Sequence, residues 1–531
     1  MSEDAVARAR AWLAADPDPD TRSELEELIT VGGAELEERF GGRLQFGTAG
    51  LRGELGAGPT RMNRVVVRQA AAGLCHWLLA RDEAERGLVV GYDARHKSDV
   101  FAEDTVRVAA ALGIRARLLP GPLPTPVLAF AVTETGAAAG VMVTASHNPP
   151  RDNGYKVYTA DGAQIVSPVD AEISAAIDAV DIAAVGLAEL TDPRIAHLGD
   201  EIADAYVAHV PSVRRVPEVS DVTVAYTPIH GVGGAIVARA FEAAGLPAAS
   251  ATPAQAEPDP DFPTVPFPNP EEPGAMDLLL AHATTIGADI AIANDPDADR
   301  VGAAVPAPGG GWRVLRGDEI GWLLGDHILR HTSGDDRLVV TTLVSSSLLG
   351  EMAKEAGVEY AETFTGFKWI ARAVLDRPAL RFVFGYEQAL GYLVTDRPLD
   401  KDGITAAVVM AEIAAVAKRD GVTVLDRLDD LARRFGRHVT AERSLRMDPA
   451  AGEAAVAALR SSPPAELAGH AVTDVEDYPE ANLLRLRCGR ARVQVRPSGT
   501  EPKVKVYGEA IDADPTALID ALVQLLLADT P

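Results

Sequence analysis

A serine beside two prolines is the first residue in this chain whose setting suggests chemistry. Ser146 lies in ASHNPP, residues 145–150, at the end of an apolar run that predicts a buried strand. Proline fixes φ and has no N–H donor, so we expect a rigid turn that holds the Ser146 hydroxyl in place. A serine hydroxyl needs assistance to react, and His147 and Lys156 are near enough in sequence to supply it. A surface turn of Ser, Asn and Pro is the alternative interpretation.

Three alternating carboxylates follow another predicted strand. Asp295, Asp297 and Asp299 stand in DPDADR, and this spacing lets them converge on one hard cation. Oxygen ligands suit Mg²⁺ and not Zn²⁺, and the segment is too short for an EF-hand loop. Arg300 follows directly and could bind a phosphate beside the metal. A solvated acidic turn is the alternative interpretation.

A third segment, RPSGTEPK, combines cationic, hydroxyl and backbone donors after a predicted strand. Such a compact donor set suits a phosphate dianion, although a solvated Gly/Pro turn has the same composition. Its candidate members are Arg496, Ser498, the Gly499 amide, Thr500 and Lys503.

Three further charged residues are weaker candidates when each is considered alone. Arg52 lies in FGTAGLRG, Lys368 in GFKWI and Glu387 in GYEQALGY. A carboxylate just past a strand, such as Glu387, could hold a pair of vicinal hydroxyls. Surface charges are the alternative for all three. We interpret His230, in TPIHGVG, as a structural or loop histidine.

Short apolar strands that alternate with amphipathic helices must position these residues. This rhythm predicts mostly parallel α/β sheets. The expected strands are residues 87–93, 139–144, 222–226, 288–293, 337–342 and 381–384. The expected helices include residues 98–112, with Ser98 as the cap, 235–244 and 404–417.

The two ends of the chain differ from this middle part. The first 40 or so residues predict a helical arm, and residues 481–488, 491–496 and 504–507 predict strands before a final helix, 515–528. Connections are expected around 434–447 and at 257–273, which holds seven prolines; a loop inside a domain is the alternative for 257–273. We therefore expect four domains, at 1–210, 211–325, 326–440 and 441–531.

The composition excludes several classes of protein. A net charge of −27 over 531 residues argues against binding to nucleic acid or to an anionic membrane. An anionic substrate would require Arg and Lys to gather locally. Cys75 and Cys488 are too few and too far apart for a disulfide framework or a zinc site. No signal peptide or membrane span is expected, which favours a cytoplasmic protein.

Together, these segments resemble the α-D-phosphohexomutase superfamily in the family's own order over nearly the whole chain. The resemblance implies an α/β protein with three related mixed α/β domains and a smaller C-terminal α+β domain around a central cleft. It implies that Ser146 carries the phosphoryl group and that Arg52 and Lys156 are active-site cations. One departure concerns the sugar loop: hexose enzymes of the family commonly have Glu-x-Ser, and this chain has Glu387-Gln388-Ala389.

The implied activity is a phosphosugar mutase that interconverts sugar 1-phosphate and 6-phosphate, with glucose first and mannose second. One Mg²⁺ per chain would be held by the Asp295, Asp297 and Asp299 carboxylates together with Ser146. A sugar bisphosphate would be the intermediate and activator. A phosphopentomutase is the main alternative, followed by a metal-dependent sugar phosphatase and a non-catalytic phosphosugar-binding protein. The expected partner is a small phosphosugar, and the sequence does not indicate an oligomeric state.

Overall fold

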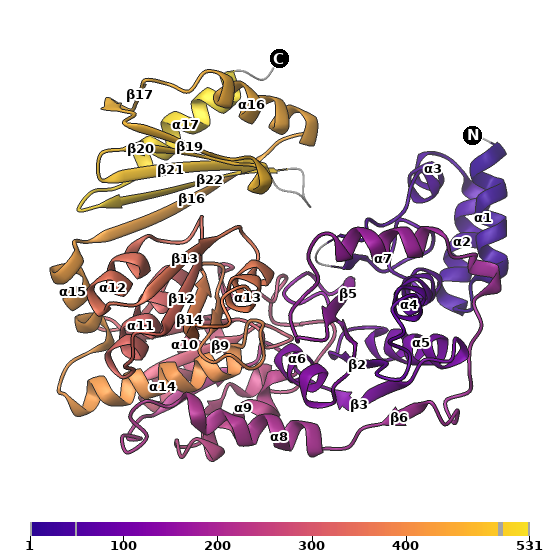
Figure 1. The fold of residues 1–531 in the computed structure, drawn as a ribbon, viewed down its shortest axis with the longest axis horizontal. Coiled ribbons are helices and arrows are strands. Elements are labelled where there is room, and N and C mark those ends of the chain that lie inside the picture. Colours follow the sequence, from indigo (N-terminus) through magenta and orange to yellow (C-terminus); the bar gives the residue numbers. More distant parts are fainter. Residues whose placement is uncertain (1–2, 48–49, 498–502, 529–531) are drawn as a thin grey trace.

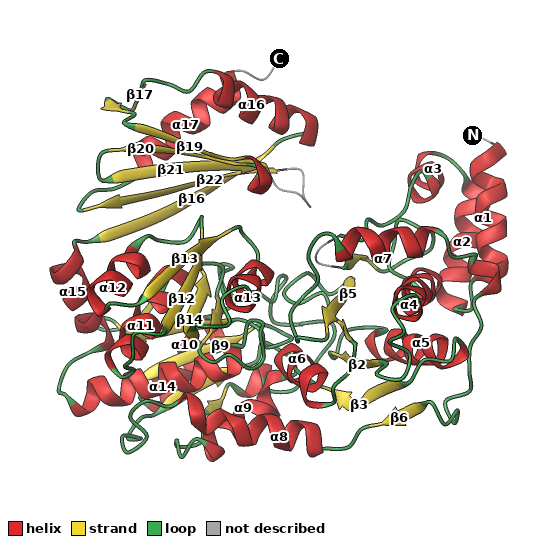
Figure 2. Ribbon diagram, in the orientation of Figure 1, coloured by secondary structure: helices red, strands yellow, loops and turns green. Residues whose placement is uncertain are grey.

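The computed structural model describes residues 3–47, 50–497 and 503–528, which build four large sheets with flanking helices (Figures 1 and 2). We call the four parts the first, second, third and C-terminal units, after their sheets in chain order. The predicted helical arm precedes the first unit and packs Leu25 into its core. Its helices are α1 (Glu3–Ala15), α2 (Pro19–Val31) and α3 (Ala34–Phe40).

The first unit has a six-stranded sheet of order β1-β5-β4-β2-β3-β6. Strands β2, β3, β4 and β6 run parallel, while β5 pairs antiparallel with both β4 and β1. The strands are β1 (Leu51–Glu54), β2 (Leu88–Tyr92), β3 (Ala116–Pro122), β4 (Ala139–Val143), β5 (Asp152–Thr159) and β6 (Ile195–His197). The helices are α4 (Arg64–Leu79), α5 (Ser98–Ala111), α6 (Thr125–Glu134), α7 (Val169–Asp178) and α8 (Glu201–His209), with α8 leading into the second unit.

The second unit has a five-stranded sheet of order β11-β10-β9-β7-β8. Strands β7, β8 and β9 are parallel, and β10 runs antiparallel to both β9 and β11. The strands are β7 (Val224–Thr227), β8 (Ser250–Ala251), β9 (Ile290–Asn294), β10 (Val301–Pro306) and β11 (Trp312–Val314), and the helices are α9 (Gly233–Ala243) and α10 (Asp277–Ile286).

The third unit has a four-stranded sheet of order β13-β12-β14-β15, in which only β15 is antiparallel to its neighbour. The strands are β12 (Arg337–Thr342), β13 (Glu359–Thr363), β14 (Arg381–Glu387) and β15 (Gly391–Leu393). The helices are α11 (Gly317–Arg330), α12 (Leu348–Ala356), α13 (Phe367–Leu375), α14 (Gly403–Arg419) and α15 (Val424–Phe435).

One structural pattern recurs in the first three units. Each has a parallel strand that turns directly into an antiparallel neighbour: β4 into β5, β9 into β10 and β14 into β15. The three intervening loops carry ASHNPP, DPDADR and the sugar-loop segment. Each loop also contains a non-glycine residue in the left-handed region, namely Ser146 (φ 54°), Ala298 (φ 55°) and Leu390 (φ 60°). The units therefore present their loops from equivalent positions.

The C-terminal unit is an antiparallel sheet of order β16-β22-β21-β20-β19. Helices α16 (Pro449–Ser461) and α17 (Thr516–Ala528) pack on it (Figure 1). The strands are β16 (His438–Arg446), β19 (Asp474–Tyr478), β20 (Leu483–Cys488), β21 (Ala491–Pro497) and β22 (Lys503–Ile511), with a separate pair β17 (Glu466–Leu467) and β18 (His470–Ala471). The predicted α/β class, with three mixed units and a smaller α+β unit, is confirmed.

Buried charged side chains attach the C-terminal unit to the third unit. Glu509 accepts hydrogen bonds from the Ser346 hydroxyl and the Ser347 amide at the N-terminus of α12. Arg492 donates to the Ser345 carbonyl. Arg485 donates to the Leu343 carbonyl and to Glu362. An anion at a helix N-terminus and arginines on strand-end carbonyls satisfy groups that would otherwise be buried without partners.

One local prediction is wrong, and another has the wrong bounds. Ser98 does not cap α5: Lys97 occupies the cap position, and the Ser98 hydroxyl donates to Asp93 instead. The connection expected around 434–447 is much shorter, because α15 of the third unit runs to Phe435 and β16 of the C-terminal unit begins at His438. Segment 257–273 contains no helix or strand, but its Phe262 and Val265 pack in the core of the second unit. It is a loop within that unit. Within the described residues, no helix has the length and apolar content needed to cross a membrane.

Candidate active site

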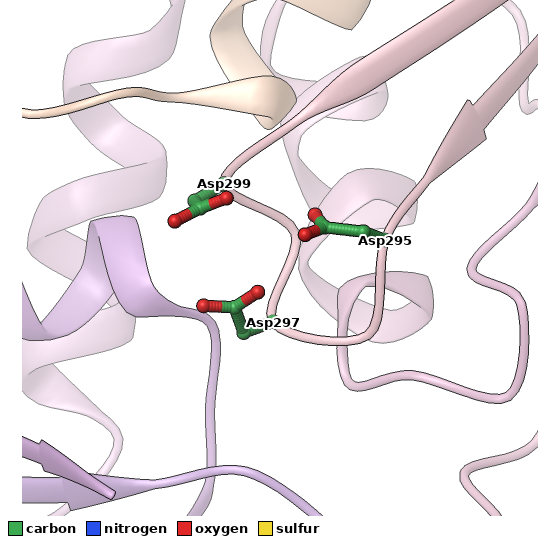
Figure 3. Close-up of side chains that lie close together, drawn as sticks. All are labelled: Asp295, Asp297 and Asp299. Atoms are coloured by element: carbon green, nitrogen blue, oxygen red, sulfur yellow. The ribbon is translucent and has the colours of Figure 1, made fainter. Parts of the chain in front are cut away.

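The three aspartates of the second unit converge on one point between β9 and β10 (Figure 3). One carboxylate oxygen from each of Asp295, Asp297 and Asp299 lies within 4.8 Å of the other two, and all three side chains are buried. Within the described chain, the buried Oδ1 atoms of Asp297 and Asp299 have no hydrogen-bond donor. Buried, converging carboxylate oxygens without donors fit a hard divalent cation.

The surroundings of the triplet shift the pKa values of Asp295 and Asp299 in opposite directions. Burial, together with the charges of Asp297 and Asp299, raises the pKa of Asp295 well above its usual range. Burial also acts to raise the pKa of Asp299, but Lys156, Lys401 and Arg300 outweigh it and hold that pKa below the usual range. The three carboxylates thus repel one another, and cationic side chains lie near Asp299. A metal cation bound between the carboxylates would relieve the repulsion.

Ser146 reaches this triplet from the first unit. Its side chain is buried, and its Oγ donates to Asp295 Oδ2 at 2.8 Å. The His147 Nδ1 atom lies 3.2 Å from the same Oγ. Burial lowers the pKa of His147 well below its usual value, and Arg300 and Arg52 lower it further. The hydroxyl therefore lies between a carboxylate and an imidazole.

Lys156 approaches the same carboxylates from β5, the antiparallel neighbour of the Ser146 strand. Its Nζ donates to Asp297 Oδ2 at 2.7 Å and to Asp299 Oδ2 at 3.0 Å. Burial alone would lower the pKa of Lys156, but these two carboxylates outweigh it and raise the pKa above the usual value. Lys156 is therefore a charged ammonium that links the first and second units.

Several of these residues line one small cavity of about 70 Å³. Arg52, an exposed residue on β1, donates to Asn148 Oδ1 at 3.2 Å. The Arg300 amide donates to Asp295 Oδ1 at 3.0 Å. A larger cavity of about 310 Å³ separates β22 from the start of α11, but none of the predicted residues that the structure describes lines it. The small cavity is lined by Arg52, Ser146, Lys156, Gln164, Asp299, Arg300 and Lys401.

Sequence reasoning missed two residues that contact the carboxylates. Lys401, in the loop before α14, places its Nζ 3.3 Å from Asp299 Oδ2. Thr125, at the start of α6, donates from Oγ1 to Asp297 Oδ2 at 2.6 Å. A lysine between two acids just before a helix was the available signal for Lys401. Nothing local distinguishes Thr125, because its partner belongs to another unit.

Glu387 and Lys368 lie in the third unit, at the end of β14 and in the first turn of α13. Glu387 ends β14 and accepts from the Gly366 amide at 3.0 Å. Burial lowers the pKa of Lys368 to about 8; Asp170 and Glu387 oppose this shift, and Arg496 adds to it. Lys368 thus interacts electrostatically with both Glu387 and Arg496. Gln388 bonds to Ser345, and Ala389 supplies no hydroxyl at the position where the family commonly has serine.

The predicted phosphate-binding segment is only partly described. Arg496 is half-buried on β21 and pairs across the sheet with Lys505 on β22. Lys503, also half-buried, begins β22. Ser498, Gly499 and Thr500 lie outside the described residues. His230 belongs to the loop after β7, where its Nε2 lies 2.8 Å from Thr264 Oγ1, and it does not line the small cavity.

Models of one protein family match four consecutive segments of this chain. Family models described as "Phosphoglucomutase/phosphomannomutase", alpha/beta/alpha domains I, II and III and the C-terminal domain, match residues 43–183, 204–310, 316–435 and 444–524. The chain belongs to the phosphoglucomutase/phosphomannomutase family. The family resemblance expected from the sequence is therefore confirmed.

Individual family relatives agree over most of the chain. It is 43% identical over 465 residues to the "Probable phosphomannomutase" of Haemophilus influenzae, covering 86% of this chain and 94% of that protein. It is 37% identical to the phosphopentomutase of Mus musculus, covering 81% and 74%. The crystal structure of a phosphoglucomutase/phosphomannomutase family protein from Burkholderia thailandensis shares the fold, with a TM-score of 0.71, 21% identity and coverage of 92% and 97%.

Membership of this family fixes the class of reaction. The chain is a phosphomutase, an isomerase that transfers phosphate within its substrate. The three carboxylates of its second unit form a group that could hold a metal ion.

Proposed function

We propose that this mutase interconverts sugar 1-phosphate and sugar 6-phosphate, with glucose phosphates preferred and mannose phosphates accepted. The observation that carries the proposal is the 2.8 Å contact of Ser146 Oγ with Asp295, within a buried carboxylate triplet flanked by cations. This contact places a hydroxyl beside a cation site, the arrangement that phosphoryl transfer requires.

The donor set fits one Mg²⁺ ion. Asp295, Asp297 and Asp299 would hold it, together with a phosphate on Ser146. The ion supplies charge neutralisation for the phosphoryl oxygens. The nearby cations Arg52, Lys156, Arg300 and Lys401 add positive potential, so a chain of net charge −27 can still bind an anionic sugar.

In the proposed cycle, Ser146 carries the phosphoryl group in the resting enzyme. Arg496 and Lys503, with Ser498, Gly499 and Thr500, bind the phosphate already on the sugar. Glu387 and Lys368 hold sugar hydroxyls, and this positioning makes the transfer effectively unimolecular.

The free sugar hydroxyl then attacks phosphorus. The new O–P bond forms as the P–Oγ bond to Ser146 breaks. The neutral His147 imidazole takes the hydroxyl proton and passes it to the departing Oγ, which lies 3.2 Å from its Nδ1, while the Lys156 ammonium supplies positive charge. The sugar bisphosphate turns round in the site. Its other phosphate returns to Ser146, which releases the isomer and regenerates the phosphorylated enzyme.

Ser146→Ala tests the proposal. We expect the variant to lose isomerisation and the added mass of one phosphate on the intact protein, while Ser461→Ala, an exposed position at the end of α16, retains both. Full isomerisation by Ser146→Ala would contradict the phosphoserine mechanism. Release of inorganic phosphate without any isomer would instead identify a phosphatase.

The sugar is tested separately, because a phosphopentomutase is the second candidate. The mouse relative carries that name, and Ala389 removes a hydroxyl that hexose enzymes of the family commonly have. Coupled assays with glucose 1-phosphate, mannose 1-phosphate and ribose 1-phosphate give three values of kcat/KM. The highest value for ribose 1-phosphate would replace the hexose proposal and leave the phosphoserine mechanism intact.

A further inference from the structure

The backbone of Ser146 is held at both of its polar groups. Its φ of 54° lies in the left-handed region, which is unfavourable for a residue with a Cβ atom and persists only where surrounding contacts enforce it. The Ser146 N–H donates to Thr144 Oγ1 at 2.8 Å. The Thr144 hydroxyl in turn donates to Asp93 Oδ2 at 2.6 Å. The proton of the Thr144 hydroxyl is thus directed at Asp93, which leaves its lone pair for Ser146.

Arg95 holds the carbonyl side of the same loop. Its Nη2 donates to the carbonyls of Ser146 and Asn148, the former at 2.6 Å. Its Nη1 donates to the carbonyls of Pro149 and Asp152 at 2.8 and 3.1 Å. The side chain is almost fully buried, so these four carbonyls account for both terminal nitrogens.

Asp93 and Phe262 fix the position of the Arg95 guanidinium. Asp93 Oδ1 accepts from the Arg95 amide, and its Oδ2 lies 3.4 Å from Arg95 Nε. The Phe262 ring covers the guanidinium at 4.9 Å, a cation–π distance. Phe262 belongs to the proline-rich loop of the second unit, the unit that also supplies the aspartate triplet.

We propose that Asp93, Thr144 and Arg95 are positioning residues that hold Ser146 in its left-handed conformation and so aim Oγ at the aspartate triplet. None of them lines the small cavity, so they act through Ser146 and not on the sugar. The proposal rests on the proposed role of Ser146 as the phosphoryl carrier. Small displacements of a reacting group are costly, and a shift of about 1 Å can lower a rate about 100-fold.

Thr144→Val is the most direct test, because it is nearly isosteric and removes only the hydroxyl link. Thr227 is a matched control in the second unit: it is equally buried, its Oγ1 accepts from the amide two residues on, Ile229, and its hydroxyl donates to Gln255. We expect Thr144→Val to lower kcat at least about tenfold with KM within about twofold. Thr227→Val should leave both constants near wild type.

Arg95→Ala, with Arg337→Ala as its control, tests the other side of the loop. Arg337 is also buried and donates to four backbone carbonyls, but it does so in the third unit, away from the cavity. Both variants should lower Tm. Only Arg95→Ala should lower kcat per folded molecule, by about 100-fold, and added guanidinium ion should recover part of that loss by occupying the vacated space.

The outcomes separate this proposal from the one on which it rests. Phosphate on wild-type Ser146, slow phosphoryl transfer in Thr144→Val and Arg95→Ala, and normal rates in both controls would support positioning. Equal kcat in Thr144→Val and Thr227→Val would overturn it, even if Arg95→Ala fails to fold. Absence of phosphate from wild-type Ser146 would contradict the proposed phosphoryl carrier itself.

Discussion

Ser146 Oγ and Asp295 Oδ2 form a 2.8 Å hydrogen bond across 149 positions of sequence and between two different sheets. The bond needs a hydroxyl proton, which a phosphorylated serine lacks. A phosphate dianion beside the Asp295 carboxylate would repel it unless a cation lay between them. Phosphorylation of Ser146 and binding of a divalent cation should therefore depend on each other.

Asp297→Asn should weaken the metal site, because it removes one anionic ligand. We expect the Mg²⁺ concentration for half-maximal activity to rise about tenfold or more, since affinity follows the charge of the ligands. The control is Asp289→Asn, just before β9 at its opposite end, where the carboxylate bonds to Lys418. An unchanged Mg²⁺ dependence in Asp297→Asn would exclude the triplet as the metal site.

Lys401→Met should slow the chemical step more than it weakens binding. The ammonium lies 3.3 Å from Asp299 in the wall of the small cavity, where a fixed cation stabilises charge that develops during transfer. We expect kcat to fall about 100-fold, measured with saturating sugar phosphate. Lys354→Met, on the exposed side of α12, is the control. A normal kcat in Lys401→Met would mean that this lysine only stabilises the fold.

Arg496→Ala should act on binding. A charge-assisted hydrogen bond to phosphate is worth about 1.5–3 kcal/mol, so KM should rise about 10- to 100-fold. Arg443→Ala, an exposed arginine on β16 of the same sheet, should behave as wild type. If KM is unchanged in Arg496→Ala, the phosphate of the substrate binds elsewhere.

Lys368 should make binding sensitive to alkaline pH. Burial lowers its pKa to about 8, so the free enzyme loses this positive charge as the pH rises through that value. KM for the sugar phosphate should therefore increase between pH 7 and 9.5. Arginine stays charged over that range, so Lys368→Arg should remove this part of the pH dependence, even if its overall affinity is lower. Parallel profiles for the two proteins would refute the assignment.

Glu412 should stabilise the contact between the second and third units. Its buried carboxylate accepts from Arg214 Nε and the amides of Arg215 and Val216, and it lies 2.9 Å from His327 Nε2. Burial alone would raise the pKa of Glu412, but the hydrogen bonds from His327 and from the Arg215 and Val216 amides outweigh it and hold the pKa at about 2.

Because this pKa lies below the usual value, the stabilisation is present above about pH 4.5 and is lost as the pH falls through about 2. Glu412→Gln should cost about 3 kcal/mol at pH 7, measured by urea unfolding, and less at pH 3. Glu351→Gln, exposed on α12, should cost little. A cost for Glu412→Gln that does not change with pH would contradict this account.

The sequence predicted the elements that follow simple periodicity, and it missed features that depend on contacts between units. Strand β12 was predicted with its observed bounds, 337–342, because Leu338–Val340 followed by two β-branched threonines is a local strand signal. The antiparallel neighbours β5 and β10 were not predicted as strands, since Lys156 and Gly302 interrupt their apolar pattern. Ser98 matched the local rule for a helix cap, but Asp93 offered its hydroxyl a better partner.

In the site, too, local patterns identified some residues, and contacts between units determine the others. Ser146 and the aspartate triplet stand in compact motifs, so residue types and spacing were enough to nominate them. The motifs are also contacted by Lys401, Thr125 and Arg95, which lie far from them in the sequence and reach them only in the folded chain. No rule of sequence spacing links these residues to the motifs. The equivalent loops of the first three units explain why the motifs converge: each lies at the same turn of its own sheet.

The attachment of the C-terminal unit has a consequence for building chimeric enzymes. Its sheet meets the third unit through Glu509 on the N-terminus of α12 and through Arg485 and Arg492 on strand-end carbonyls and Glu362. In these contacts the C-terminal unit supplies side chains, and the third unit supplies mostly backbone groups. A C-terminal unit grafted from a relative would therefore need little adaptation of the recipient, provided that it brought its own acid and two arginines at these three positions.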